Sequence, residues 1–209
     1  MEISVLQLGQ VGTNCYIFHA EGSPKCGVID PGGQGAQLCA WLKEHDLEPE
    51  AVLLTHGHFD HILAIPELRA QWPGLPVYCH PADLGTGETT SVFGQRFPTV
   101  RSFGNITPYK EGDVVNVAGV NVEVLETPGH TPGSVTLRAE DVLFTGDTLF
   151  EGSMGRTDLP GGDEAAIMKS LKRLAQLEGD YQVLPGHEGR STLERERKTN
   201  YCIRAAMSR

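Results

Sequence analysis

The stretch THGHFDH, residues 55–61, places three histidines and an aspartate directly after the apolar run AVLL. If a strand ends just before it, His56 and His58 lie on the same side of an extended backbone, and the glycine between them takes no space. Asp60 and His61 follow where the chain turns toward a helix, so we expect their side chains to serve a second point nearby. Imidazole and carboxylate groups bind Zn²⁺ or Fe²⁺ at about 2.0–2.2 Å, and the stretch therefore predicts parts of a metal site.

Three more candidate ligands follow predicted strands in the same way. His130 ends the PGH that comes after VNVEVLET, Asp147 follows DVLFT, and His187 ends the PGH that comes after YQVL. Open α/β folds place their chemistry at the carboxyl ends of strands, where all of these residues are predicted to lie. Five histidines and two aspartates held together without a cation would suffer mutual desolvation and carboxylate repulsion. We therefore expect a bound metal.

The composition excludes several other classes of function. The 209 residues carry 27 acidic and 17 basic side chains, a formal charge of −10 at pH 7, and no basic run stands out. This balance disfavours nucleic acid and anionic membranes as partners. No segment approaches about 18 uninterrupted apolar residues, and the N-terminus has no signal-peptide pattern, so we expect a cytoplasmic protein without a membrane span.

The remaining histidines and the cysteines are given structural roles. His19, His45 and His80 do not follow a strand in the same pattern, and we assign them to surface or core packing. The cysteines are odd in number and show no C-x-x-C spacing, which suits small buried hydrophobes in a reducing compartment. The five are Cys15, Cys26, Cys39, Cys79 and Cys202.

The elements that must position the candidate ligands are readable from the apolar pattern. Short β-branched or alternating runs predict strands throughout the chain. Helices are predicted near 34–45, at 163–177 with Asp163 as its cap, and from the capping box STLE, residues 191–194, to the end. The combination predicts one layered α/β (α+β) domain over residues 1–209, with sheets inside and helices outside.

Two further features of the chain bear on its organisation. The segments GVIDPGG to AVLLTHGH and VLFTGDT to YQVLPGH resemble each other as strand–helix–strand units, which permits a degenerate internal duplication. Residues 83–107 form a long irregular excursion, and long loops inside compact domains are often functional.

Four motifs in this order, THGHFDH, TPGHTPGS, FTGDTLF and LPGHEG, resemble the metallo-β-lactamase superfamily. The resemblance implies a four-layer αββα sandwich with a metal site at one edge of the two sheets. It implies two divalent ions as cofactors, with Zn²⁺ expected and Fe or Mn as alternatives. It assigns the seven candidate ligands as follows: His56, His58 and His130 to a first metal, Asp60, His61 and His187 to a second, and Asp147 to both as a bridge.

A centre of this kind favours hydrolysis. Metal-bound water can reach a pKa of about 7, and a metal polarises a carbonyl and stabilises its oxyanion. Asp60 and Asp147 are the candidate catalytic carboxylates, with Asp60 placed to orient a metal-bridging hydroxide. The stretch FEGSMGRTDLPGGD, residues 150–163, is similar to short bacterial glyoxalase-II-like hydrolases, which cleave thioesters of the S-lactoylglutathione (hydroxyacylglutathione) type.

The glyoxalase-II-like resemblance has one departure. Full-length glyoxalase II continues into a C-terminal helical domain that helps to bind glutathione, and this chain stops soon after His187. The resemblance therefore implies thioester hydrolysis more firmly than it implies glutathione specificity.

Other activities of the same family are weighed against this one. Persulfide dioxygenases share much of the motif set, including GRTD, but bind a single iron through residues that match His56, His130 and Asp147, and they remain the alternative. Lactamases of this fold generally place cysteine where Asp147 stands, which disfavours antibiotic hydrolysis.

Aromatic and basic residues alternate in the 83–107 excursion. Arg96 and Arg101 lie among Phe93, Phe97 and Phe103. We hypothesise a substrate-facing flap whose arginines meet the carboxylates of a thiol carrier. The alternative is a surface loop that its aromatic residues hold in place.

Two residues outside the ligand set have candidate roles near the metals. Arg156 is a third candidate substrate contact, although a salt bridge with Asp158 that shapes the loop beneath the metals is the preferred interpretation. Asp30 in IDPGG either fixes the tautomer of a ligand histidine or forms a turn before Pro-Gly. The expected partner is a small acyl-thioester, and the chain is expected to be a monomer or a homodimer.

Overall fold

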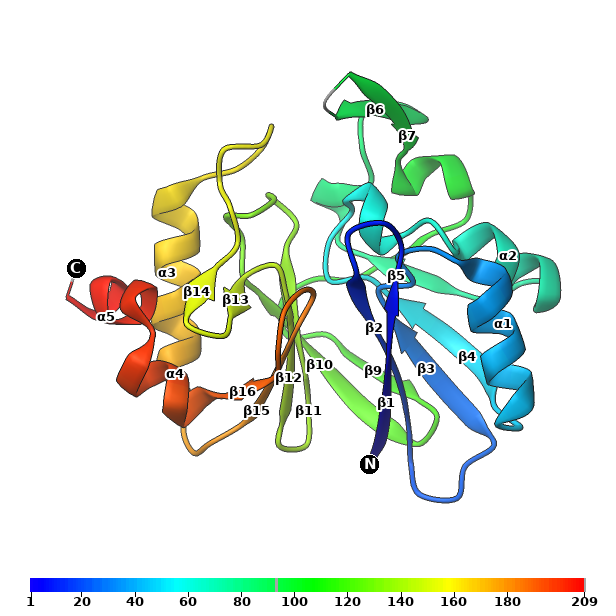
Figure 1. Cartoon of the computed structure of the whole chain (residues 1–209), viewed down its shortest axis with the longest axis horizontal. Helices are drawn as coiled ribbons and strands as arrows, with labels where there is room; N and C mark the ends of the chain where they lie inside the picture. The colour runs from blue at the N-terminus through cyan, green and yellow to red at the C-terminus, as the bar shows by residue number, and fades with distance from the viewer. Residues whose placement is uncertain (93, 209) are drawn as a thin grey trace.

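The computed structural model describes residues 1–92 and 94–208, and two six-stranded sheets form its centre (Figure 1). The first sheet has the order β1 (Glu2–Leu8), β2 (Thr13–His19), β3 (Lys25–Ile29), β4 (Glu48–Leu53), β5 (Val77–Cys79) and β8 (Thr107–Pro108). The second has the order β16 (Ser191–Thr192), β15 (Gln182–Pro185), β12 (Val142–Gly146), β11 (Val135–Ala139), β10 (Val120–Glu126) and β9 (Val114–Val117). Two hairpins complete the strands: β6 (Thr89–Val92) with β7 (Gln95–Pro98), and β13 (Leu149–Phe150) with β14 (Ser153–Met154).

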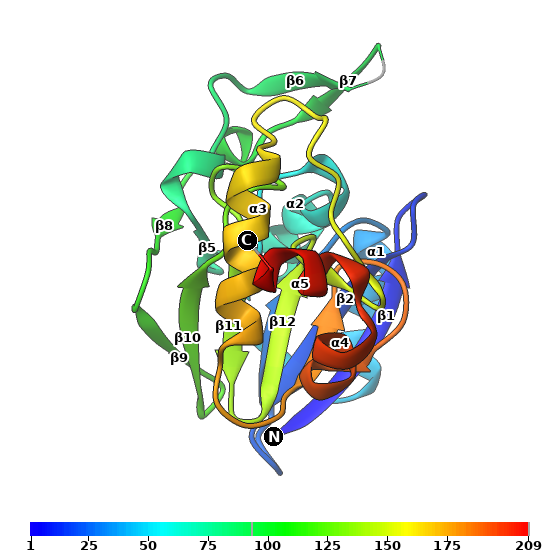
Figure 2. The same ribbon diagram turned by 90° about the vertical axis from the view of Figure 1, so that its left-hand side faces the viewer.

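Helices cover the outer face of each sheet (Figures 1 and 2). On the first sheet lie α1 (Gly35–Glu44) and α2 (Ile65–Gln71). On the second lie α3 (Glu164–Ala175), α4 (Leu193–Thr199) and α5 (Tyr201–Met207). Among the described residues, three short 3₁₀ turns lie in the connections that follow β4, β5 and β7: η1 (Phe59–His61), η2 (Pro81–Asp83) and η3 (Val100–Phe103). The predicted four-layer αββα sandwich is confirmed.

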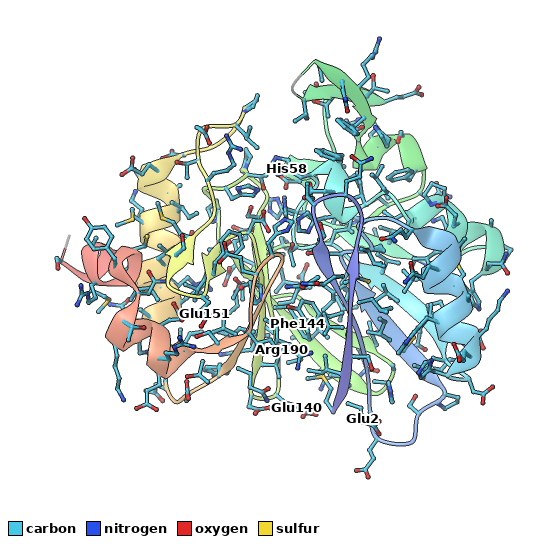
Figure 3. The ribbon with its side chains drawn as sticks, viewed as in Figure 1. Glu2, His58, Glu140, Phe144, Glu151 and Arg190 are labelled. Carbon is cyan, nitrogen blue, oxygen red and sulfur yellow. The ribbon has the colours of Figure 1, made fainter. Side chains whose placement is uncertain are left out.

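The layering follows from side-chain alternation along the strands. In β4, Leu53 packs into the cluster between the two sheets, while Val52 packs into the cluster beneath α1 and α2. In β12, Phe144 lies between the sheets (Figure 3), and Leu143 packs against α3 and α5. Each sheet therefore buries both faces, and three apolar clusters separate four layers.

The two similar strand–helix–strand segments both form parallel units. One is β3–α1–β4 and the other is β12–α3–β15, and each strand pair is parallel. The helix predicted at 163–177 is α3, and Oδ1 of Asp163 accepts a hydrogen bond from the Ala166 N–H at 3.0 Å as its cap. Parallel pairing places the carboxyl ends of these strands at one edge of each sheet, where the candidate ligands follow.

The prediction for the C-terminal helix is wrong at its start and in its continuity. Ser191 lies in β16, and the cap is Thr192, whose hydroxyl accepts from the Arg195 N–H at 3.2 Å. The helix breaks at Asn200, which has extended backbone angles and caps α5 with its side-chain oxygen. The amide of Asn200 also donates to the Ser153 carbonyl at 2.9 Å, so the break lets one side chain bind both α5 and the β13–β14 hairpin.

The 83–107 excursion is more ordered than predicted, because it contains the β6–β7 hairpin and η3. Phe97 stacks on Phe59 with ring centroids 3.8 Å apart, and Phe103 packs against the first-sheet core. Phe93 lies outside the described residues. Figure 1 shows the hairpin projecting above the two sheets.

Two further expectations are tested by the fold. No helix in the described part of the chain is long and apolar enough to cross a membrane. All five cysteines are free; four are buried, as expected of small hydrophobes, and Cys202 is half-buried.

Candidate metal centre

The seven candidate ligands come from four loops that meet at one edge of the two sheets. The loops follow β4, β10, β12 and β15, at the carboxyl end of each strand. Figure 3 shows His58 at this edge, between the half of the molecule that carries α1 and α2 and the half that carries α3 to α5. The structure therefore brings all seven together, as the strand-end rule predicts.

The first group is a trio of histidines that could hold one metal ion. His56, His58 and His130 place one ring nitrogen each within 4.8 Å of the others. Nδ1 of His130 lies 2.7 Å from the carbonyl oxygen of Arg156, which can only accept a hydrogen bond. This contact puts the His130 proton on Nδ1 and leaves Nε2, which lies 2.8 Å from His58 Nδ1, directed into the trio.

The second group combines a carboxylate with two histidines. Asp60, His61 and His187 place one ligand atom each within 4.8 Å of the others. Oδ2 of Asp60 lies 3.3 Å from Nε2 of His187 and 3.6 Å from Nε2 of His61. On the far side of its ring, Nδ1 of His61 lies 3.0 Å from Oδ2 of the buried Asp30, which directs Nε2 toward the centre.

Asp147 lies between the two trios. Its Oδ2 is 3.4 Å from His130 Nε2 and 3.5 Å from His187 Nε2, and its Oδ1 is 3.5 Å from His61 Nε2. The side chain thus reaches one ring of the first trio and two of the second. This is the geometry that a bridging ligand requires.

Three polar atoms at this centre fit a bound cation. Nε2 of His56, Nε2 of His61 and Oδ1 of Asp147 are buried without a hydrogen-bond partner among the described residues. Buried polar atoms are normally paired, so their convergence calls for a ligand. A Cβ on Gly186 would lie 2.4 Å from Asp147 Oδ1, which shows how tightly the backbone closes around the site. Imidazole and carboxylate donors match divalent zinc or iron.

Two histidines of the first trio, His56 and His58, are held in the neutral form that a metal needs. Burial, together with the rings of His130 and His61, lowers the pKa of His58 to about 4. Burial and the neighbouring rings also lower the pKa of His56. Neutral imidazole is the ligand form, so these two residues are ready to bind a metal at neutral pH.

The second trio carries a proton in the metal-free chain. Burial opposes the charged form of His61, but the carboxylates of Asp60, Asp147 and Asp30 outweigh it and raise its pKa to about 10. Burial raises the pKa of Asp60, and the rings of His61 and His187 outweigh it to give a lowered value. The pKa of His187 is raised by its contacts with Asp60 and Asp147 against the effect of burial. A metal in this trio must displace a proton.

Asp30 serves both of the roles considered for it. Its backbone has φ of 51°, a left-handed turn conformation before Pro31. Its carboxylate accepts hydrogen bonds from the Thr55 N–H at 2.8 Å and the Thr55 hydroxyl at 2.6 Å, in addition to facing His61. The turn therefore aims the carboxylate at both ends of the ligand-bearing loop.

The three arginines that were candidate substrate contacts each bind within their own loop. Arg96 donates to the Thr89 hydroxyl at 2.7 Å across the β6–β7 hairpin, and Arg101 donates to the Gly85 carbonyl at 2.9 Å. Arg156 forms the predicted salt bridge with Asp158, with two contacts of 2.7 Å between exposed side chains. The loop of Arg156 shapes the centre through its backbone, since its carbonyl faces His130.

The histidines left out of the centre do lie elsewhere. His45 stacks on Trp41 with ring centroids 3.8 Å apart, and His19 contacts the carbonyl of Ala20. His80 contacts Glu126 at 3.1 Å and caps η2.

Sequence reasoning missed one residue close to the centre. Asp83 is buried and hydrogen-bonds to the loops of both His58 and His130. It follows β5 at the carboxyl end, as the predicted ligands follow their strands, so the same rule could have found it. The sequence does not single it out, because Asp83 stands at the start of the 83–107 excursion and not directly after an apolar run.

Comparison with known proteins places the chain among metal-dependent enzymes. The profile of the metallo-beta-lactamase superfamily matches residues 8–187. The chain is 36% identical over 191 residues to the probable metallo-hydrolase YqgX of Bacillus subtilis, covering 87% of this chain and 88% of YqgX. It is 32% identical over 207 residues to the hydroxyacylglutathione hydrolase GloC of Haemophilus influenzae, covering 96% and 97%.

Solved structures give the same fold. The B3 metallo-beta-lactamase BLEG-1 has a TM-score of 0.84 at 32% identity, covering 97% of this chain and 99% of BLEG-1. TTHA1623 in a di-iron-bound form has a TM-score of 0.79 at 36% identity, covering 95% and 98%. ETHE1 from Myxococcus xanthus has a TM-score of 0.78 at 28% identity, covering 96% and 84%.

Proposed function

The chain belongs to the metallo-β-lactamase superfamily, and from this premise we propose that it is a dinuclear metal-dependent hydrolase that cleaves thioesters of the S-lactoylglutathione type. The observation that carries the proposal is the second trio. Asp60, His61 and His187 converge, and a buried carboxylate, Asp30, orients one of them. A second metal ion needs a second set of ligands of this kind, whereas a single-iron site at His56, His130 and Asp147 does not use it.

The geometry of the centre supports the ligand roles that the family resemblance implies. His56, His58 and His130 would hold one divalent ion, Asp60, His61 and His187 a second, and Asp147 would contact both. When bound, such a pair of ions lowers the pKa of water and stabilises negative charge on a carbonyl oxygen. Zinc is the expected metal; the similarity to TTHA1623 makes iron the principal alternative.

Asp60 is the group that would orient the attacking hydroxide. Its side chain is 17% exposed, which leaves it reachable from solvent, and Oδ2 points at His61 and His187. The hydroxide oxygen would add to the acyl carbon while Asp60 orients the hydroxide by accepting a hydrogen bond from its remaining proton. Collapse of the tetrahedral oxyanion would then break the carbon–sulfur bond and release the thiolate.

The leaving group favours a thioester over an amide. A thiol has a pKa near 8.5, so its anion leaves without prior protonation, whereas an amine must be protonated as it leaves. The side chains of the centre are metal ligands in this proposal, and none is left over as a dedicated acid among the described residues. The similarity to the hydroxyacylglutathione hydrolase GloC supports the same substrate class.

The decisive experiment compares three substrates with zinc-loaded and iron-loaded protein. Each form is assayed with S-lactoylglutathione, with a β-lactam, and with glutathione persulfide in an oxygen electrode. We expect thiol release from the thioester to be the fastest reaction. Faster β-lactam opening, or oxygen uptake without thiol release, would overturn the proposal.

A persulfide dioxygenase is the second candidate function. The residues matching its single-iron site, His56, His130 and Asp147, are also close together, since His130 Nε2 lies 3.4 Å from Asp147 Oδ2. Two histidines and one carboxylate leave open positions on iron for oxygen. The substitution His187→Ala separates the two candidates, because it damages only the second trio. It should abolish a dinuclear hydrolase and leave most of the activity of a mononuclear oxygenase.

Arg96, Arg101 and Arg156 stay proposals as substrate contacts. Their present contacts are with neighbouring groups on the surface, which a carboxylate of the thiol carrier could replace. Each is tested as an alanine variant on a series of acyl-thiols. An arginine that binds substrate will raise KM for carriers with a carboxylate and not for those without one.

A further inference from the structure

We propose that Asp83 is a positioning residue for the first trio, so that the zinc affinity of His56, His58 and His130 depends on a carboxylate that contacts neither metal nor substrate. The inference rests on the proposed dinuclear centre. It assigns a role to the first residue of the excursion that the sequence pattern had suggested was a substrate flap.

The carboxylate of Asp83 joins the two loops that carry the first trio. Oδ2 accepts hydrogen bonds from the Gly57 N–H at 2.9 Å and from the Thr131 hydroxyl at 2.6 Å, and Oδ1 accepts from the Gly133 N–H at 2.7 Å. Gly57 stands between His56 and His58, and Thr131 directly follows His130. One buried side chain therefore holds the backbone on both sides of the trio.

The two loops pack directly onto Asp83. A Cβ on Gly57 would lie 2.2 Å from the Asp83 carbonyl oxygen, and a Cβ on Gly133 would lie 2.6 Å from Asp83 Oδ1. Real Cβ atoms do not approach other atoms so closely, so glycine lets the first backbone lie against the Asp83 main chain and the second against its carboxylate. The glycines in THGH and in TPGS are thus explained by contact with a third loop.

The position of Asp83 is itself fixed by the strand that leads to His130. His80 caps η2, its Nδ1 accepting from the Ala82 N–H at 3.2 Å, and its Nε2 lies 3.1 Å from Oε1 of Glu126. Glu126 is the last residue of β10, four residues before His130. The 3₁₀ turn is therefore anchored to the same element whose loop Asp83 holds.

The hydrogen bonds that Asp83 accepts are of a kind that a carboxylate makes strongly. All three donors are neutral, and hydrogen bonds to an ionised acceptor are roughly twice as strong as those between neutral groups. The second trio has a comparable support in Asp30, which binds Thr55 and His61. Each proposed metal thus has its own buried carboxylate behind its ligands, and loss of such a partner commonly lowers metal affinity by about 10–100-fold.

The test isolates each trio before Asp83 is changed. His187→Ala leaves the first trio intact, and His58→Ala leaves the second intact. Asp83→Asn is added to each variant, and Zn²⁺ affinity is measured by titration of the metal-free protein against a competing chelator. We expect Asp83→Asn to weaken zinc binding by about 10–100-fold in the His187→Ala background and by less than about 2-fold in the His58→Ala background.

Controls separate positioning from general destabilisation. Val122→Ala shortens a fully buried side chain of β10 between the sheets and should lower Tm without changing zinc affinity in either background. If Asp83→Asn does not fold, Thr131→Val removes one of the three hydrogen bonds at constant shape and should give a smaller loss in the same background only. Equal losses in both backgrounds, or no loss in either, would overturn the proposal.

Thioester hydrolysis is measured in a separate assay, so the proposed role of Asp83 and the proposed hydrolase activity can fail independently. Background-specific zinc loss in a chain that does not cleave thioesters would leave the role of Asp83 standing and refute the proposed activity. Absence of zinc binding by the unaltered chain would refute both.

Discussion

The two trios are expected to differ in the protons that they release when metal binds. In the metal-free chain the pKa of His61 is raised to about 10, while that of His58 is lowered to about 4. At pH 7.5 His58 is therefore neutral and His61 protonated. Zinc entering the second trio must displace the His61 proton from the ring, whereas His56 and His58 have none to lose.

The size of the effect follows from the distance between pH and pKa. At pH 7.5 His61 lies about 2.5 units below its pKa, so its deprotonation costs the second trio roughly 3 kcal/mol of binding free energy. Each pH unit gained between 7 and 9 should raise zinc affinity of the second trio about tenfold, and that of the first trio far less.

The assay is isothermal titration calorimetry in pairs of buffers with different ionisation enthalpies. Metal-free His187→Ala reports on the first trio and metal-free His58→Ala on the second. We expect about one more proton released per zinc by the second trio than by the first. Equal proton release, or an affinity of the second trio that does not change between pH 7 and 9, would refute the assignment of protonated His61.

Three further predictions follow from the same contacts. Asp30→Asn keeps the size of the side chain but leaves at least one buried donor of Thr55 or His61 without an acceptor. The free energy of unfolding of the metal-free chain in urea should therefore fall by about 1–3 kcal/mol. The control Asp163→Asn can keep its helix cap and should change this free energy by less than about 0.5 kcal/mol. The free energy of unfolding of the metal-free chain should be highest near pH 6.5. As pH falls toward 4, the unfolded chain binds a proton that buried His58 does not bind, and as pH rises toward 10, the unfolded chain loses a proton that His61 keeps, so stability falls in both directions. A stability that rises steadily across this range would contradict the pKa directions. Asp147→Ala should lower kcat for thioester hydrolysis by about 10³-fold or more and uncouple the two zinc-binding steps; normal turnover would exclude a bridging role.

The arrangement of the centre was predictable because it obeys two local rules. Apolar runs mark the strands, and polar side chains directly after a strand meet at its carboxyl edge. His56, His130, Asp147 and His187 all follow this pattern, and the structure brings them together. The caps of α3 and the alternation in β4 and β12 are equally local and were equally readable.

What could not be predicted depends on contacts between distant segments. Nothing near Asn200 in the sequence indicates that its amide binds the β13–β14 hairpin, and this contact goes with the break between α4 and α5. Asp83 is similar, because its partners Gly57 and Gly133 lie 26 and 50 residues away. Its role became visible only when both loops were placed against the same carboxylate.

The most direct test of the account is an anomalous-scattering map from a crystal of the unaltered chain loaded with zinc. The account predicts two peaks about 3.5–4 Å apart, one among His56, His58 and His130 and the other among Asp60, His61 and His187, both in contact with Asp147. A single peak confined to the first trio in saturating zinc, or none, would contradict it.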